Sequence, residues 1–255
     1  MTHQRSPVRT DGWSLIVQAL TRPYPVTLPM VVLVLLVPCY IFIAQDVAGG
    51  PVHVPALPLD LVIPLVPGWA LVYGPLYLFL ILFPVLVIRQ LEHVRRTVYA
   101  YLLVWVTAYA CFYLYPTLAP RPAEVEGEGF AVWGLKVLYG ADPSYNCFPS
   151  LHVAHSFVSA LTCYRLQRKL GTAMVLCAML VAVSTLFTKQ HYVADVVAGA
   201  LLAVLAYALF LARYPQQPTS ALDRRAAPLL AVVASGIVGL FFLAAWVAYT
   251  MGVSP

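Results

Sequence analysis

His191 and Asp195 carry the clearest chemistry in this sequence. Asp195 follows His191 at the i, i+4 spacing, so at the start of a helix both side chains lie on one face. The carboxylate of Asp195 can then accept a hydrogen bond from one imidazole nitrogen, which fixes the tautomer and leaves the other nitrogen nucleophilic. The plainer alternative is an aspartate that caps a helix beside a packed histidine. The pair alone does not decide between them.

A second segment, Pro149-Ser150-Leu151-His152, has the features of a helix start. Ser150 is a good N-cap, and the free backbone N–H groups from Leu151 onward can bind phosphate oxygens at the positive end of the helix dipole. His152 lies in that first turn and can protonate a leaving oxygen as a general acid. Taken alone, His152 equally fits an interfacial histidine, and Ser150 either donates its hydroxyl to phosphate or only caps the helix.

Cations complete a possible phosphate site. Arg121 stands between two prolines, which makes it a stiff bidentate clamp for an anion. Lys189, two residues before His191, adds charge at the phosphate or is simply a surface residue. The order of Arg121, then His152, then His191 with Asp195 indicates phosphoryl transfer through a covalent phosphohistidine. In that reaction His191 attacks phosphorus, Asp195 orients it, and His152 protonates the departing oxygen.

Three further residues have weaker claims. His155 follows His152 by three residues and either supports the site or packs in the core, and packing is the plainer explanation. Lys136 could fold in toward the phosphate. Tyr192 could pack against the nucleophile or position it, and the sequence does not decide.

These residues must be positioned by membrane helices. The chain is 62% hydrophobic and 10% charged, far from the roughly 25% charge of soluble domains. We predict an all-α integral membrane protein with a short interfacial helix within residues 1–25 and a C-terminal seventh span within residues 214–255. Between them lies a six-span catalytic core, residues 26–213, with spans near 26–44, 68–88, 98–115, 150–166, 172–187 and 191–213.

The distribution of positive charge predicts the orientation. With a cytoplasmic N-terminus, twelve of the fifteen Lys and Arg residues fall inside, in the N-terminus and the loops near 89–96, 165–171 and 213–225. Arg121, Lys136 and Lys189 fall outside, in the same layer as His152 and His191. This multi-pass topology places the site on the extracytoplasmic side, where the three cations suit an anionic ligand.

These motifs resemble the type-2 phosphatidic-acid phosphatase superfamily, whose signature is K-x6-R-P, P-S-G-H and S-R-x5-H-x3-D. Arg121-Pro122, Pro149-Ser150-Leu151-His152 and His191 with Asp195 match it, and Ser184 holds the serine position of the third motif. The resemblance covers roughly residues 57–199. It implies a lipid phosphatase or phosphotransferase that needs no metal and no other cofactor.

The sequence departs from that signature at three positions. The first lysine is replaced by Leu114, the glycine by Leu151 and the third-motif arginine by Thr185. These forms are closer to the inositol phosphorylceramide synthase branch. Fewer cations suit a phosphodiester, which carries one negative charge, better than a monoester, which carries nearly two. We therefore favour transfer of a phospho-headgroup from a phospholipid to an alcohol or lipid acceptor. The alternative is a lipid phosphate or polyprenyl pyrophosphate phosphatase that uses water.

Other classes fit less well. A transporter or channel should carry ionisable residues at mid-membrane depth, whereas here they gather at span ends. A metal or haem protein using His152, His155 and His191 lacks a complete ligand set. The basic residues do not gather into a nucleic-acid-binding face. The expected partners are therefore the membrane, a phospholipid or lipid phosphate, and an acceptor that is an alcohol, a lipid or water.

Overall fold

The computed structural model describes residues 11–214 and 220–255, and these ranges contain helices and no β-strand. Arg5 and Arg9, which were counted among the basic residues of the predicted cytoplasmic N-terminus, lie outside the described residues. In chain order the elements are α1 (Gly12–Thr21), α2 (Leu28–Val47), α3 (Pro58–Val62), a 3₁₀ turn η1 (Pro67–Trp69), α4 (Ala70–Val87), α5 (Leu91–Leu114), α6 (Phe130–Ala141), α7 (Leu151–Leu166), α8 (Arg168–Phe187), α9 (Val193–Phe210) and α10 (Ala221–Thr250).

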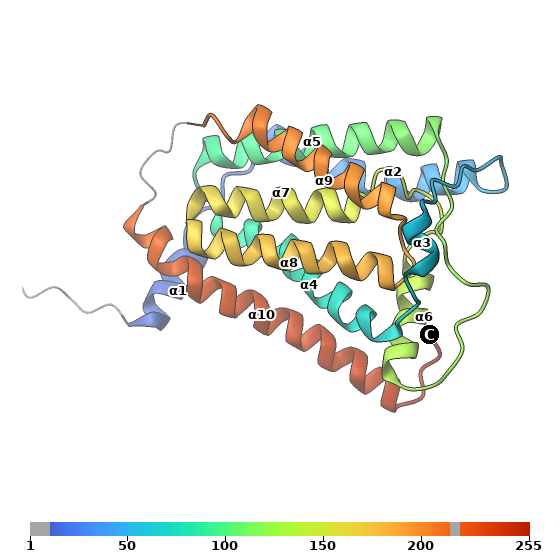
Figure 1. Cartoon of the computed structure of the whole chain (residues 1–255). Helices are drawn as coiled ribbons and strands as arrows, with labels where there is room; N and C mark the ends of the chain where they lie inside the picture. The colour runs from blue at the N-terminus through green and yellow to red at the C-terminus, as the bar shows by residue number, and fades with distance from the viewer. Residues whose placement is uncertain (1–10, 215–219) are drawn as a thin grey trace, which may run out of the picture.

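Six of the described helices are long and apolar enough to cross a membrane, namely α2, α4 with η1, α5, α8, α9 and α10. They run side by side as one bundle, with α10 along one edge (Figure 1). Large apolar side chains are exposed along the outer faces of these helices, as a hydrocarbon surrounding requires. The predicted all-α integral membrane fold is therefore confirmed.

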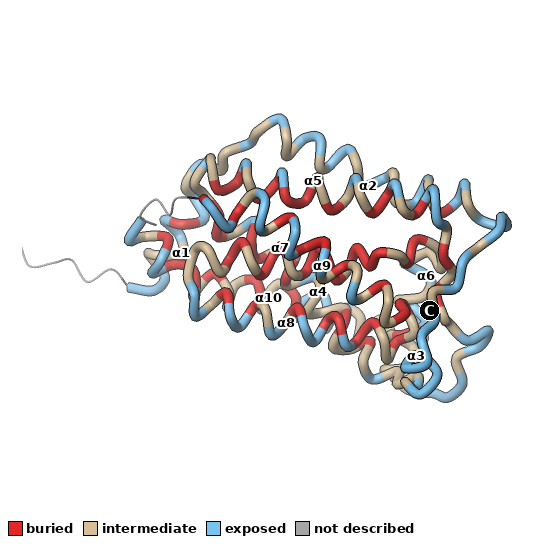
Figure 2. Tube along the Cα trace, turned by 45° about the horizontal axis from the view of Figure 1, so that its top comes forward, coloured by how far each residue is buried: buried red, intermediate tan, exposed pale blue. Residues whose placement is uncertain are grey.

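Helix α7 lies in the middle of the bundle and is shorter, at 16 residues. It packs against α4, α5, α8 and α9, and most of its residues are buried (Figure 2). This enclosure lets it carry polar groups that hydrocarbon could not satisfy. The Ser159 hydroxyl pairs with the Tyr101 hydroxyl at 2.8 Å, and the Thr162 hydroxyl lies 3.0 Å from Nε2 of His93.

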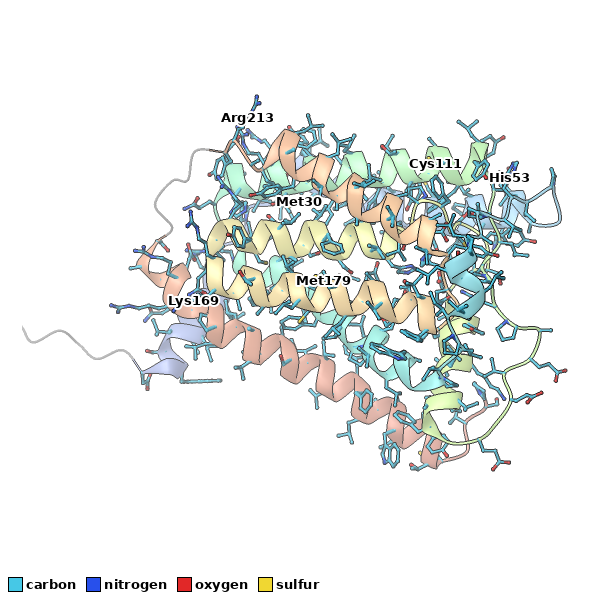
Figure 3. The ribbon with its side chains drawn as sticks, viewed as in Figure 1. Met30, His53, Cys111, Lys169, Met179 and Arg213 are labelled. Atoms are coloured by element: carbon cyan, nitrogen blue, oxygen red, sulfur yellow. The ribbon has the colours of Figure 1, made fainter. Side chains whose placement is uncertain are left out.

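The two ends of the bundle differ in character. Lys169 and Arg213 lie at one end, whereas His53 lies at the opposite end (Figure 3). The first residues of α7 and of α9 are at the His53 end, together with α3 and α6 (Figure 1). The two motif histidines therefore lie at the end away from Lys169 and Arg213.

Two sequence-based boundaries were wrong. Helix α5 begins at Leu91, so Arg95 and Arg96 lie in its first turns and not in a loop. Glu92 forms an ion pair with Arg96 at 2.7 Å. The i, i+4 spacing brings these two side chains together on the surface of a helix. Between the predicted spans near 98–115 and 150–166, where no helix was predicted, the structure has the apolar helix α6, which packs on α4 and η1.

Candidate active site

The starts of α7 and α9 are joined directly by backbone contacts. The N–H of Ser150 donates to the carbonyl of Asp195 at 3.0 Å. Gly199, one turn further along α9, lies so close that an added Cβ would meet the carbonyl oxygen of Ser150. Only a residue without a side chain permits this approach. The two motifs, distant in sequence, therefore form one rigid corner.

A substitution at this corner tests that closeness. Gly199→Ala places a methyl group against the Ser150 carbonyl and must push α9 away from the start of α7. We expect a loss of about 1–3 kcal/mol in stability and a larger fractional loss of activity. The control is Gly236→Ala on α10, where an added Cβ meets nothing within 4 Å. The midpoint of thermal unfolding in detergent and the turnover rate should both fall for Gly199→Ala and stay unchanged for Gly236→Ala. Equal behaviour of the two variants would contradict the expectation.

At this corner two histidines and an aspartate lie in a row. Nδ1 of His152 is 3.3 Å from Nε2 of His191, and Nδ1 of His191 is 3.4 Å from Oδ2 of Asp195. His191 and Asp195 are buried, at 4% and 0% exposure. The structure thus brings together the three residues that the sequence singled out, with the second nitrogen of His191 facing His152.

The reason for the His191–Asp195 contact differs from the predicted one. We expected both residues on one face of a helix, but α9 begins at Val193 and His191 lies in the preceding turn. Lys189 there adopts a positive φ of 54°, and the N–H groups of Gln190 and His191 both point to the carbonyl of Thr185. Asp195 reaches back as a cap, accepting the N–H of Tyr192 at 2.8 Å with the same oxygen that faces His191.

One arrangement of the imidazole protons satisfies both contacts in this row. If Nδ1 of His191 donates to the Asp195 carboxylate, then its Nε2 has a free lone pair. The hydrogen bond between the histidines then requires the proton on Nδ1 of His152. In this arrangement Nε2 of His191 can act as a nucleophile, and Nδ1 of His152 carries a proton that it can donate. Displacement at phosphorus needs both a nucleophile and a proton donor.

Arg121 lies in a dense set of contacts beside this row. Its Nη1 donates to the carbonyls of Tyr139 and Asp142 at 3.1 and 2.9 Å, and its Nη2 lies 3.4 Å from the Asp142 carboxylate. Nη2 also donates to the side-chain oxygen of Gln190, the residue before His191. The guanidinium lies over the Tyr139 ring, 4.6 Å from its centroid. Arg121 is thus held next to the segment that carries Gln190 and His191.

The comparisons with known proteins agree with this geometry. A family model described as the PAP2 superfamily matches residues 64–209, which is more than half of the chain. The chain belongs to the PAP2 superfamily. A PA-phosphatase related-family protein of Dictyostelium discoideum is 27% identical over 110 aligned residues, which cover 37% of this chain and 20% of that relative. The chain thus aligns with about a fifth of the relative's length. No solved structure gives a significant match.

Membership in the PAP2 superfamily confirms the resemblance inferred from the motifs and supports an enzyme of the phosphatase kind. The three departures are visible in the fold. Leu114 is exposed at the end of α5, and Thr185 is fully buried near the end of α8. Leu151 is a buried first residue of α7 and packs with Ala154 and Val158. Neither Leu114 nor Thr185 supplies a charge to this PAP2 site.

Three other residues predicted for the site, Ser150, Lys189 and Tyr192, lie near the starts of α7 and α9. Ser150 caps α7 by accepting the N–H of Val153 at 3.3 Å. The Lys189 ammonium donates to the carbonyls of Asp60 and Ile63, at 3.3 and 2.6 Å, and so connects the α3 segment to the turn before α9. Tyr192 is buried, and this burial raises its pKa.

His155 and Lys136 lie apart from the row of histidines and aspartate. His155 is buried and stacks on the Tyr101 ring with 4.5 Å between centroids, so it packs as a core aromatic side chain. Lys136 is exposed on α6 and forms no ion pair within the described ranges. Their roles at the site stay predictions.

Sequence reasoning missed several groups at the site. Asp142 and Gln190 bind Arg121, and Asp60 accepts the N–H of Val193 at 2.8 Å, which adds a second cap at the start of α9. The Tyr73 and Tyr77 rings stand edge-on to His152, with centroids 5.6 and 4.9 Å away. Nothing in the local sequence signals these roles, because each depends on an element distant in the chain.

One cluster has the composition of a metal site. Cys147, His191 and Asp195 each offer a ligand atom, and these atoms lie within 4.8 Å of one another. A thiol binds metal as a thiolate, yet burial raises the pKa of Cys147 well above its usual value. Oδ2 of Asp195 already accepts the N–H of Tyr192 and faces His191, whereas Oδ1 has no hydrogen-bond partner among the described residues.

Proposed function

We propose that this PAP2 protein transfers a phosphate group of a membrane lipid through a covalent phosphohistidine at His191. The observation that carries the proposal is the row from His152 to His191 to Asp195, in which Nε2 of His191 faces His152 and not the carboxylate. Superfamily membership and the membrane fold support a lipid substrate.

The reaction has two displacements at phosphorus. First, Nε2 of His191 forms a bond to phosphorus while the bond from phosphorus to the leaving oxygen breaks, and His152 gives that oxygen its proton. Second, His152 takes a proton from the acceptor hydroxyl, whose oxygen then bonds phosphorus as the bond to His191 breaks. Arg121 and the free N–H groups at the start of α7 bind the negative oxygens.

The charge balance favours a phosphodiester donor. Leu114 and Thr185 stand where the superfamily motif has cations. The Lys189 ammonium donates hydrogen bonds to two backbone carbonyls. Arg121 remains as the cation bound within the site, and its charge is partly offset by Asp142. A diester carries one negative charge, so this arrangement favours headgroup transfer to an alcohol or lipid acceptor, as in inositol phosphorylceramide synthases.

Hydrolysis of a lipid phosphate with water as acceptor is the second candidate. It is favoured by the similarity to the Dictyostelium protein, which is described as PA-phosphatase related. One pair of assays separates the two: the purified protein receives either a phosphodiester lipid or a lipid phosphate, each labelled at phosphorus, while an acceptor alcohol is titrated. Headgroup transfer predicts that the diester gives a new labelled phosphodiester that increases with acceptor. Release of inorganic phosphate from the lipid phosphate, with no new diester at any acceptor concentration, would reject transfer and leave hydrolysis.

A conservative change at Arg121 tests anion binding. Arg121→Lys keeps the charge but cannot reproduce the fork that contacts Asp142, Gln190 and two carbonyls. We expect kcat/KM to fall by about 10²-fold, with a smaller loss of stability. The control is Arg95→Lys, an exposed cation at the other end of the bundle. Steady-state kinetics in mixed micelles measures both variants, and an unchanged kcat/KM for Arg121→Lys would remove Arg121 from the phosphate site.

We also propose that the site faces the extracytoplasmic side. Arg121, Lys136 and Lys189 belong to the site end, whereas Lys169 and Arg213 lie at the opposite end (Figure 3). Positive residues concentrate on the cytoplasmic side of membrane proteins. Lys136→Cys on exposed α6 should react with a membrane-impermeant maleimide added to sealed cells. Labelling only after the membrane is opened would reverse the orientation.

A further inference from the structure

A cavity of about 440 Å³ lies between α4, α6 and α10 and ends at His152. Its wall is apolar over most of its length, with Leu138 of α6 and Val238 and Phe242 of α10 among the lining residues. Its volume falls within the range of about 300–1,000 Å³ that is common for ligand pockets. The cavity is therefore large enough for a hydrophobic group.

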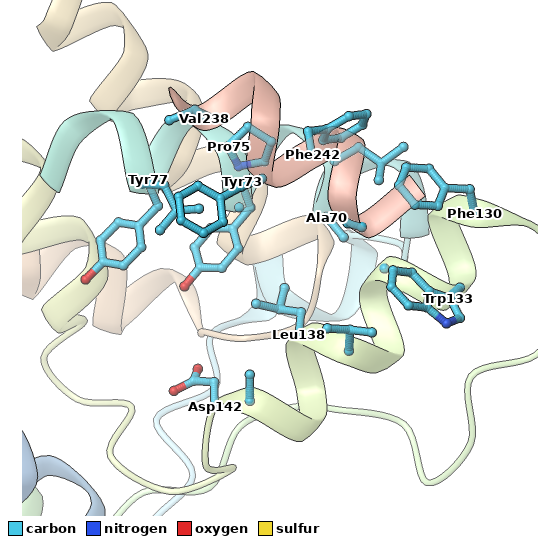
Figure 4. Close-up of a pocket in the computed structure, with 18 of the residues that line it drawn as sticks. Ala70, Tyr73, Pro75, Tyr77, Phe130, Trp133, Leu138, Asp142, Val238 and Phe242 are labelled. Carbon is cyan, nitrogen blue, oxygen red and sulfur yellow. The ribbon is translucent and has the colours of Figure 1, made fainter. Parts of the chain in front are cut away.

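One end of the cavity is polar and belongs to the active site. Asp142, the partner of Arg121, lines this end together with His152. The hydroxyl groups of Tyr73 and Tyr77 point toward the same side as the Asp142 carboxylate, whereas Phe130, Trp133 and Phe242 gather at the other side (Figure 4). A ligand in the cavity would thus have its polar group at His152 and its apolar part against aromatic rings.

Helix α10 supplies one wall and lies beyond the part of the chain that matches the PAP2 family model, residues 64–209. Phe130 of α6 contacts Phe242 and Trp246 of α10 edge-on, at 5.4 and 4.9 Å between centroids. The indole N–H of Trp133 donates to the carbonyl of Val253 at 2.8 Å. The seventh span is thus fixed against α6 where the cavity needs a wall.

We propose that this cavity holds one hydrocarbon chain of the lipid substrate, and that α10 thereby adds chain selectivity to the common core. The proposal rests on the proposed function, because the occupant is the apolar part of the molecule whose phosphate lies at His152. Because His152 lines the cavity, we assign the cavity to the substrate and not to a lipid that takes no part in the reaction. A second apolar groove, between α2, α4 and α5, includes His155 but not His152.

Gly74 offers a way to fill the cavity. It lines the cavity on α4, and an added Cβ there meets nothing within 4 Å, so a larger side chain enters open space. Gly74→Leu should lower kcat/KM about tenfold for a long-chain donor lipid, assayed both as a phosphodiester and as a lipid phosphate. The compounds without a chain, a p-nitrophenyl phosphodiester and p-nitrophenyl phosphate, should be turned over as before. The matched control is Gly236→Leu, an exposed glycine of α10 that does not line the cavity.

The outcomes separate this inference from the proposed function. Wild-type protein that turns over neither the phosphodiesters nor the phosphate monoesters would reject the proposed function and with it the cavity assignment. Turnover of a long-chain compound and of its counterpart without a chain, with Gly74→Leu as active as the wild type on both, would overturn the cavity assignment alone. A lipid phosphate with a photoreactive diazirine at its chain end gives a second readout on wild-type protein, independent of folding of the variant. Labelling of α10 near Phe242 is expected, and labelling confined to α2 and α5 would place the chain in the other groove.

Discussion

Replacing His191 with alanine should give a protein that inserts normally but neither turns over lipid phosphate nor forms an acid-labile phosphoenzyme. The nitrogen that would bond phosphorus is removed, and His152 alone faces no carboxylate partner that would fix its tautomer. We expect turnover to fall on the order of 10⁴-fold or more. The measurement is acid quenching after a brief exposure to substrate labelled at phosphorus, with steady-state turnover measured in parallel.

His53→Ala is the matched control for this result. His53 lies at the same end of the bundle and stacks on Tyr115 with 4.0 Å between ring centroids, but it contacts neither His152 nor His191. Its variant should keep both turnover and the phosphoenzyme. A phosphoenzyme that persists in His191→Ala would assign the covalent step to another residue and contradict the mechanism.

Asp195→Asn should cost nearly as much while leaving the helix cap in place. The amide oxygen of asparagine can take the position of Oδ2 and accept the N–H of Tyr192, so the start of α9 is preserved. The same oxygen then faces Nδ1 of His191 as an uncharged acceptor. It holds the Nδ1–H tautomer of His191 less strongly, and it no longer stabilises the positive charge that the imidazole ring gains when Nε2 bonds phosphorus. A loss on the order of 10²–10⁴-fold in kcat is expected, as for the loss of the orienting aspartate in serine proteases.

The control for Asp195→Asn is a second aspartate, on α3, that caps the same helix. Asp60 also accepts a backbone N–H at the start of α9, from Val193 at 2.8 Å, but it makes no contact with either histidine. Asp60→Asn changes charge and capping in the same way and should keep most of the activity. Equal losses in the two variants would mean that Asp195 acts through the fold and not through the tautomer of His191. Thermal unfolding in detergent measures the structural part of each effect.

The sequence was sufficient for the membrane helices and for the types of residue at the site. Long apolar segments and the scarcity of charge predict spans almost independently of tertiary structure. The spacing of His191 and Asp195 also predicted a contact that the structure contains, although the geometry comes from a turn and a cap. Local patterns predicted which side chains meet, but not the backbone that brings them together.

Other features depended on tertiary contacts that no local pattern contains. Asp142 appeared to be an ordinary loop acid, yet it accepts from the Tyr40 hydroxyl at 2.7 Å and pairs with Arg121. Helix α6 was missed because it is short and lies in a segment rich in acidic residues and glycine. Arg95 and Arg96 indicated a loop, but their long side chains let a helix carry them at its end, where the charges reach the membrane surface.

The length of α7 has a consequence for where catalysis takes place. Sixteen residues extend about 24 Å, less than the roughly 30 Å of a hydrocarbon core, while the adjacent α5 is eight residues longer. In the orientation proposed above, with its other end among the basic residues at the cytoplasmic surface, α7 would start below the opposite membrane surface. His152 would then lie at the depth of lipid phosphates, and a lipid could react without being lifted out of its leaflet. Each methylene withdrawn into water would cost about 0.8 kcal/mol, and a recessed site avoids that expense for chains of any length.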